Sequence, residues 1–183
     1  MGAIPDSLTN EFRTAGGRIV RDGGGITPDV EIKAPQYSRI TLSLSYSGIL
    51  EQYAVEYVKK HASIPAVKDF HMSDADYEDF IAYAKDREFD YRSSAKTYFD
   101  QMSRQLESEG LKDSMEEEPE ALNKAIDLDK ETYLRLKKDE IVPLIEEEIV
   151  VRYYFQPAGI ELRNRYDTQL HKALESPRIS LGS

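Results

Sequence analysis

The run from His71 to Asp76, His-Met-Ser-Asp-Ala-Asp, gathers one imidazole and two carboxylates in a short stretch of chain. Imidazole and carboxylate groups are accepted ligands of divalent metal ions, so this run could in principle hold a metal. The order of residues favours another role. A serine followed by Asp74 and Asp76 is typical of a helix N-terminus, where the side chains interact with free backbone amides and with the positive end of the helix. We therefore predict a capped helix beginning at Ser73 and no metal site.

The remaining residues that could do chemistry do not assemble a nucleophile and a base. The sequence contains no cysteine, which removes thiol nucleophiles, disulfides and thiolate metal sites. No serine lies in a Gly-x-Ser-x-Gly pattern, none is expected to belong to a Ser-x-x-Lys arrangement, and His61 and His171 are isolated in the sequence. The glycine-rich run 22–25 is not followed by the Gly-Lys-Ser/Thr of a phosphate-binding loop, so a tight connection between strands is the simpler interpretation. We predict no catalytic, cofactor-binding or metal-binding residues in this chain, and no cofactor.

Two further clusters are candidates for binding rather than catalysis. The run Glu146–Glu148 cannot direct all its carboxylates at one ligand, because consecutive helical residues point about 100° apart, and it is interpreted as a solvated face. Arg152 follows Glu148 by four residues, which predicts an exposed ion pair. The run Arg152, Tyr153, Tyr154 is aromatic and cationic, so it could serve as an interaction surface. Core packing at a helix end is the alternative, and we favour it because aromatic side chains dominate small helical cores.

Composition places these residues in an ordinary globular chain. The 183 residues are 40% apolar and 32% charged, with no apolar run long enough to span a membrane and no signal-peptide pattern at the N-terminus. The net charge of -10 argues against nucleic acid as a partner, since affinity for a phosphate backbone depends on clustered Lys and Arg.

Two zones are visible along the chain, with a border near Ala34 and Pro35. Residues 1–34 contain most of the clustered glycines, and the runs 18–21 and 26–32 flank a glycine-rich turn, which predicts a β-hairpin. Residues 35–183 contain few glycines and show apolar spacings of three and four, which predicts helices. The expected fold is mainly α, a helical bundle of about five helices with a short N-terminal β-hairpin.

The helices can be placed approximately. A first helix covers 49–58, a second follows Ser73, and a third begins at Ser93 or Ser94, carries an apolar stripe through Tyr98 and Met102, and stops at Gly110. A fourth runs from about residue 122 towards residue 154 with a kink or restart at Pro143, and a short fifth follows Asp167. The stretch 40–46 alternates apolar and polar residues, so helix and strand both stay open there.

One motif resembles a known family. The sequence Phe-x-Thr-x-x-Gly-Arg-x-Val-x-Asp-Gly-Gly-Gly-Ile-x-Pro-Asp, residues 12–29, resembles the end of the peptidase domain in tail-specific, or C-terminal processing, serine proteases of the Bacteroidetes type. The family-motif residues, to which we assign a structural role, are Gly23, Gly24, Gly25, Ile26, Pro28 and Asp29. The likeness continues in the helical zone, including 61–65, 70–80 and 147–154.

The resemblance implies a parent protein with a PDZ module, a serine nucleophile and a lysine general base. Both catalytic residues would lie before Met1, so no catalytic role is carried over and the chain alone should be inactive. It also implies that 40–46 belongs to the first helix. The chain would be the last β segment of the peptidase domain plus a helical C-terminal extension acting as scaffold or assembly region. Its partners would be the catalytic and PDZ domains, with a homodimer also allowed, and the parent would be exported to the periplasm to process the C-termini of protein or peptide substrates.

Two alternative functions are also considered for this chain. A free-standing helical adaptor could bind peptides through the surface around Tyr153 and Tyr154. A metal hydrolase using His71 and Asp74 is a more distant third.

Overall fold

The computed structural model describes residues 10–17, 19–21, 32–111 and 118–175 of the 183-residue chain. The chain divides into two compact units, Met1–Pro35 and Gln36–Ser183. Mainly helical structure with a small two-stranded antiparallel sheet near the N-terminus confirms the predicted fold class.

The first unit contains the sheet. Strand β1 (Glu11–Arg13) pairs antiparallel with β2 (Ile19–Arg21), and Phe12 lies opposite Val20. The turn between them uses Gly17, whose φ of 82° suits glycine, and the Gly17 amide donates to the Thr14 carbonyl at 2.9 Å. The sequence prediction had paired the run 18–21 with the run 26–32 instead. The motif residues Gly23, Gly24, Gly25, Ile26, Pro28 and Asp29 lie outside the described residues, as does nearly all of that second run.

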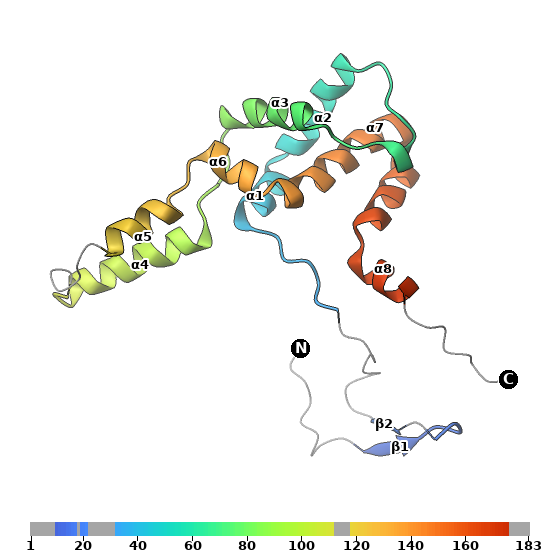
Figure 1. Ribbon diagram of the computed structural model, residues 1–183, viewed down its shortest axis with the longest axis horizontal. Coiled ribbons are helices and arrows are strands. Elements are labelled where there is room, and N and C mark those ends of the chain that lie inside the picture. Colours follow the sequence, from blue (N-terminus) through green and yellow to red (C-terminus); the bar gives the residue numbers. More distant parts are fainter. Residues whose placement is uncertain (1–9, 18, 22–31, 112–117, 176–183) are drawn as a thin grey trace. The chain divides into compact units, whose positions relative to one another are not determined.

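The second unit contains eight α-helices within the described residues, where about five were predicted. They are α1 (Arg39–Ser47), α2 (Ile49–Lys60), α3 (Asp74–Lys85), α4 (Ser94–Ser108), α5 (Glu118–Ile126), α6 (Lys130–Leu136), α7 (Lys138–Tyr166) and α8 (Thr168–Glu175), with a short 3₁₀ helix η2 (Val67–Asp69) (Figure 1). The greater number arises because the chain interrupts helical runs at caps. Gly48, with a φ of 73°, ends α1 and begins α2, and Lys137 separates α6 from α7.

The stretch left open between helix and strand is helical. In α1, Ile40 and Leu44 are fully buried, whereas Leu42 and Tyr46 are 42% and 87% exposed. A period of four on the buried face is that of a helix. The alternation seen in the sequence arose because the exposed face of α1 also carries apolar residues.

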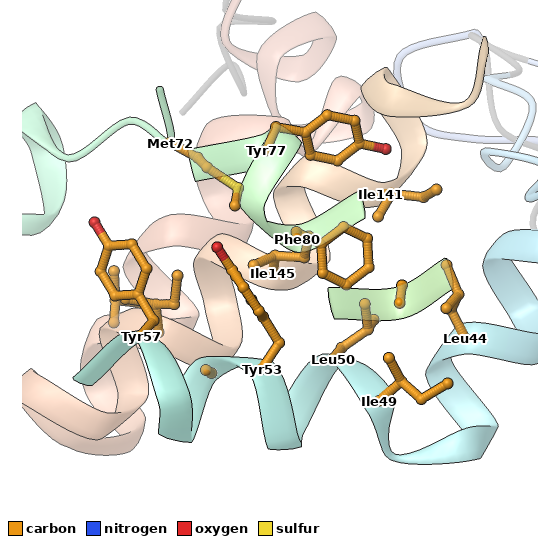
Figure 2. Packing of buried hydrophobic residues seen from close by; sticks show 14 of the residues in the cluster. Leu44, Ile49, Leu50, Tyr53, Tyr57, Met72, Tyr77, Phe80, Ile141 and Ile145 are labelled. Atoms are coloured by element: carbon orange, nitrogen blue, oxygen red, sulfur yellow. The ribbon is translucent and has the colours of Figure 1, made fainter. Parts of the chain in front are cut away.

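The core of the second unit lies between α1, α2, α3 and α7, with side chains from α6 added (Figure 2). Tyr53 of α2 sits near its centre, with its ring edge-on to Phe80 of α3 at a centroid distance of 5.2 Å. Burial raises the pKa of the Tyr53 hydroxyl, which therefore stays protonated and donates to the Asp76 carbonyl at 2.8 Å. Tyr77 likewise donates to the Leu134 carbonyl at 2.7 Å. These buried tyrosines add apolar surface without leaving a polar group unpaired.

Helices α4 and α5 pack against each other side by side (Figure 1). The predicted start and stop of α4 are confirmed, because Ser93 caps its first turn and Gly110, with a φ of 71°, lies just past its end. The predicted apolar stripe is not a core stripe, however. No residue of α4 is buried, and Tyr98 and Met102 are 69% and 42% exposed. A single neighbouring helix covers only part of the apolar face.

Helix α7 consists of two segments that meet at Phe155. The break was expected at Pro143, but the backbone there is helical, and the non-helical residue is Phe155, with φ 65° and ψ -176°. Pro157 cannot donate to the Tyr153 carbonyl, and a proline is well tolerated in the first turn of the segment that begins after Phe155. The backbone region of Phe155 is essentially restricted to glycine, and holding another residue there costs on the order of 1–3 kcal/mol.

The second segment of α7 runs back along the first. Gly159 lies against Val151 and Glu147, and Arg163 forms an ion pair with Glu147. Ala158 and Leu162 of the returning segment are buried. The close approach needs a residue without a side chain at position 159, since a Cβ atom there would lie 2.8 Å from Val151 Cγ2.

Candidate functional site

The candidate interaction surface Arg152, Tyr153, Tyr154 lies on the first segment of α7 and faces the connection after α2. Arg152 forms the predicted ion pair with Glu148 at 2.8 Å, and it also donates to the Glu51 carbonyl at 3.1 Å. Its guanidinium therefore links α7 to α2. The Arg152 side chain is 20% exposed, and an i,i+4 helix pair of this kind contributes only ~0.3–0.5 kcal/mol, so the role of Arg152 is chiefly positional.

The two tyrosines bind the backbone of the connection that follows α2. Tyr153 donates its hydroxyl to the His61 carbonyl, and Tyr154 donates to the Ile64 carbonyl at 2.8 Å and to the Pro65 carbonyl at 3.2 Å. Burial raises the pKa of Tyr153, which keeps this donor protonated. The polar ends of both side chains are thus engaged within the unit, as the packing alternative expects.

A shallow hollow of about 420 Å³ adjoins Tyr154. It is lined by Val67 and Lys68 on one side and by Pro157 and Ala158 of the returning segment on the other. The aromatic ring of Tyr154 remains 40% exposed at this edge. The hollow therefore combines apolar surface with the side chains of Lys68 and Glu161, and the hydroxyl of Tyr154 is engaged by the Ile64 and Pro65 carbonyls.

The acidic run after His71 forms a helix cap. Ser73 accepts a hydrogen bond from the Asp76 amide at 3.1 Å, and the Asp76 carboxylate accepts from the Ser73 amide at 3.3 Å, which together make a capping box. Asp74 instead pairs with Lys138 of α7, and the hydrogen bond from Lys138 lowers the pKa of Asp74. The predicted capped start of α3 is confirmed. Within the described residues, no three His, Asp or Glu side chains are grouped as metal ligands would be.

The run Glu146–Glu148 diverges as predicted, but the interpretation of a solvated face is wrong for Glu146, which is 1% exposed. Its carboxylate accepts from the Met72 amide at 2.7 Å, from the Tyr166 hydroxyl at 2.7 Å and from Arg165 at 3.4 Å. A buried carboxylate is tolerated only when paired and hydrogen-bonded in this way. The sequence signal that could have revealed it is its position between Val142 and Val150, on the buried side of α7.

Arg165 completes this cluster by binding backbone as well. It donates to the Phe70 carbonyl at 2.8 Å and to the Val67 carbonyl, both in the segment that contains η2. Glu146, Arg165 and Tyr166 therefore join both segments of α7 to the connection between α2 and α3. The cluster stabilises the fold, and its polar groups form hydrogen bonds with one another and with the backbone of the connection.

A second carboxylate that the sequence did not single out is Glu140. It accepts from the Ser38 amide at 2.7 Å and from the Thr41 hydroxyl at 2.9 Å, so it supplies the missing cap of α1 from a distant helix. Burial acts to raise its pKa, but hydrogen bonds from Ser38, Lys137 and Thr41 outweigh burial and lower the pKa to about 2.

The expectation that no serine belongs to a Ser-x-x-Lys arrangement is wrong. Ser93 and Lys96 stand three residues apart, a spacing used by some serine hydrolases. In the structure the Ser93 hydroxyl accepts from the Lys96 backbone amide at 2.9 Å, as a helix cap does. The Lys96 ammonium donates to Asp100 at 2.8 Å and to Asn123 at 2.6 Å. Both side chains are thereby engaged by other partners, so the pair does not meet as a nucleophile and its base.

A hollow of about 680 Å³ lies on the surface of the helical unit. It lies between the segment before α4, the α4–α5 pair and α6, and residues from all of these line it, including Tyr91, Lys96, Ile126 and Leu136. Leu136 is 64% exposed at its edge. The hollow combines apolar walls with both signs of charge, so its lining suits a mixed, peptide-like chain better than a highly charged ligand.

These observations define a mainly helical domain whose polar side chains cap helices and join them to one another. None of the helices that the structure describes has the length and apolar character of a membrane span. Residues 40–176, more than half of the chain, match the protein family described as "Probable PDZ-protease, C-terminal helical domain". The chain therefore belongs to this family. No curated protein and no solved structure matches it.

The family match confirms the predicted relationship to the C-terminal region of a processing peptidase. It implies that the helical domain is associated with the other domains of such a protease. The matched residues begin inside α1 and end just past α8, so they coincide with the helical unit rather than with the glycine-rich motif.

Proposed function

We propose that this chain is the C-terminal part of a tail-specific serine endopeptidase, in which the helical unit acts as a scaffold or assembly region and takes no part in the chemistry. The observation that carries the proposal is the family match over residues 40–176. The glycine-rich motif at 12–29, which resembles the segment following the catalytic lysine in such proteases, supports the finer assignment.

The packing of the helical unit supports a scaffold role. Side chains from α7 bind the backbone of the α2–α3 connection at His61, Ile64 and Phe70. Among the described residues, every buried side-chain nitrogen or oxygen has a hydrogen-bond partner. A unit with its polar groups satisfied internally can hold a fixed shape against a neighbouring domain.

The activity of the parent protein follows from the same assignment. A serine nucleophile activated by a lysine base would cleave proteins near their C-termini, and a PDZ module would recognise those ends. Export to the periplasm is part of the proposal and rests on the resemblance alone. This chain would contribute stability, positioning of the catalytic domain, or assembly.

The test compares the parent protein with a version that ends before Gln36. We expect the shortened protein to lose cleavage of an unfolded peptide substrate, or to melt at a lower temperature, because the catalytic domain loses its support. Unchanged activity and unchanged melting would contradict the scaffold role. Cleavage of the same peptide by the 183-residue chain alone, abolished by a single serine substitution within it, would contradict the assignment of chemistry to the parent.

The second candidate function is peptide binding by the helical unit, and the 680 Å³ hollow beside α4 and α6 is the observation that favours it. Calorimetric titration of the chain with peptides carrying free C-termini separates the two candidates. A scaffold predicts no saturable binding. An adaptor predicts saturable binding that weakens when Leu136→Asp places a charge on the exposed apolar edge, while Leu174→Asp, at a similarly exposed site of α8, leaves binding unchanged.

A further inference from the structure

The turn at Phe155 is an unfavourable connection between two well-packed segments. Its backbone, with φ 65° and ψ -176°, lies in a region that residues with a Cβ atom avoid. The side chain is 75% exposed, so contacts made by the ring do not offset the strain. The structure must impose this conformation through what lies on either side of it.

What imposes it is the docking of the returning segment of α7, residues 157–166. Leu162 is 1% exposed, Arg165 binds the Phe70 carbonyl, and Tyr166 binds the buried Glu146. All these contacts are made to residues on the far side of the Phe155 turn. The same contacts would form if the returning segment belonged to a second copy of the chain, provided that it lay in the same position.

The surface under the returning segment is specific for that segment. Val151 approaches position 159 so closely that only glycine fits there without displacement. Glu146 is buried beneath it and needs the donors that Arg165 and Tyr166 supply. A second copy of this chain carries the same glycine, arginine and tyrosine in the same order, and is therefore an occupant that satisfies every one of these requirements.

We propose that two copies of this chain exchange residues 157–166, so that the returning segment of each docks on the first segment of α7 and on η2 of the other. In the exchanged dimer Phe155 takes an extended conformation, and the strain of the turn is released in both chains. The contacts of the returning segment are all remade between copies. Short connections under strain favour this kind of exchange.

The experiment refolds the full 183-residue chain at increasing protein concentration and measures mass by size-exclusion chromatography with light scattering. The wild-type dimer fraction should rise with concentration. Phe155→Gly permits the tight turn without strain and should lower the dimer association constant about tenfold or more. Phe155→Ala keeps the Cβ atom and so keeps the strain, and should dimerise like the wild type.

The two variants distinguish dimerisation driven by backbone strain from dimerisation through contacts of the exposed aromatic ring. If the exposed ring itself joined two copies, alanine and glycine would abolish the dimer equally, and the proposal would be overturned. A wild-type chain that stays monomeric at every concentration would overturn it as well, as would a dimer that Phe155→Gly leaves unchanged.

A crosslinking measurement identifies the exchange directly. Glu147 and Arg163 form an ion pair across the two segments, and the chain contains no cysteine of its own. A Glu147→Cys chain and an Arg163→Cys chain are refolded together and treated with a short bismaleimide. Exchange brings the two thiols together in a covalent heterodimer. A dimer that yields no such product is assembled in another way and contradicts the proposal.

Discussion

Gly159 lies so close to Val151 that a Cβ atom at position 159 would stand 2.8 Å from Val151 Cγ2. Both residues belong to α7, one in each of the segments that meet at Phe155. Real Cβ contacts are longer than this, so any larger residue at 159 must push the two segments apart. The approach of these two residues is what allows the second segment to return along the first.

Gly159→Ala should therefore destabilise the chain, although alanine is the better helix former by ~1 kcal/mol. Overpacking in a close contact costs about 1–3 kcal/mol, and after the gain in helix propensity the net loss should be up to about 2 kcal/mol in the free energy of unfolding. Urea denaturation followed by circular dichroism measures it. When Gly159→Ala is introduced into a chain that already carries Val151→Ala, most of this loss should disappear, because the clashing methyl group is gone. An equal loss in the wild-type and Val151→Ala backgrounds would show that the contact is not responsible.

Replacing the buried Glu146 tests the cluster that joins α7 to the α2–α3 connection. Glu146→Ala leaves the Met72 amide and the Tyr166 hydroxyl without their acceptor and removes the negative charge beside Arg165, which should cost roughly 2–4 kcal/mol of stability. Glu161→Ala, on an exposed part of the same helix, serves as the control and should change stability by no more than ~0.5 kcal/mol. Equal effects of the two substitutions would contradict a structural role for Glu146.

Glu140 should make stability depend on pH in the acidic range. Its pKa is about 2 in the folded chain, against an ordinary value of 4.5, because its hydrogen bonds favour the charged form. A lowered pKa contributes stability that is fully present above pH 4.5 and is lost as the pH falls from 4.5 towards 2. The contribution is at most about 3 kcal/mol. Denaturant unfolding between these pH values should show a shallower decline for Glu140→Gln than for the wild type, and parallel declines would contradict the assignment.

Substitutions of two aromatic residues, on helices that follow each other in the chain, should differ sharply in their effect on stability. Phe80 of α3 is fully buried against Tyr53, so Phe80→Ala should cost about 3–5 kcal/mol. Tyr98 of α4 is 69% exposed, so Tyr98→Ala should stay within ~0.5 kcal/mol of the wild type. Thermal unfolding of both variants provides the comparison. A large loss for Tyr98→Ala would mean that its face of α4 is covered by something in solution.

Features that depend on neighbours in sequence were predictable. The caps at Ser73 and Ser93 and the stop at Gly110 were all placed correctly, because each involves residues within a few positions of one another. The Arg152–Glu148 pair was predictable for the same reason.

Features that depend on a distant segment were not predictable. The burial of Glu146 requires the Met72 amide, 74 residues away in the sequence, and the cap of α1 comes from Glu140, 102 residues after Ser38. The exposure of Tyr98 has the same origin, because an apolar stripe shows that a helix can pack and does not show how many neighbours will pack on it. The break at Phe155 was missed because the sequence drew attention to Pro143, whereas tertiary contacts hold the turn before Pro157.

The way in which α7 binds the connection between α2 and α3 determines which sequence changes this connection tolerates. Tyr153, Tyr154 and Arg165 all bind carbonyl oxygens there, groups that every amino acid possesses. Side chains such as Lys68 can therefore be exchanged without touching these bonds. An inserted or deleted residue would shift the carbonyls out of reach. The length of this connection, more than its composition, is what the helical domain constrains.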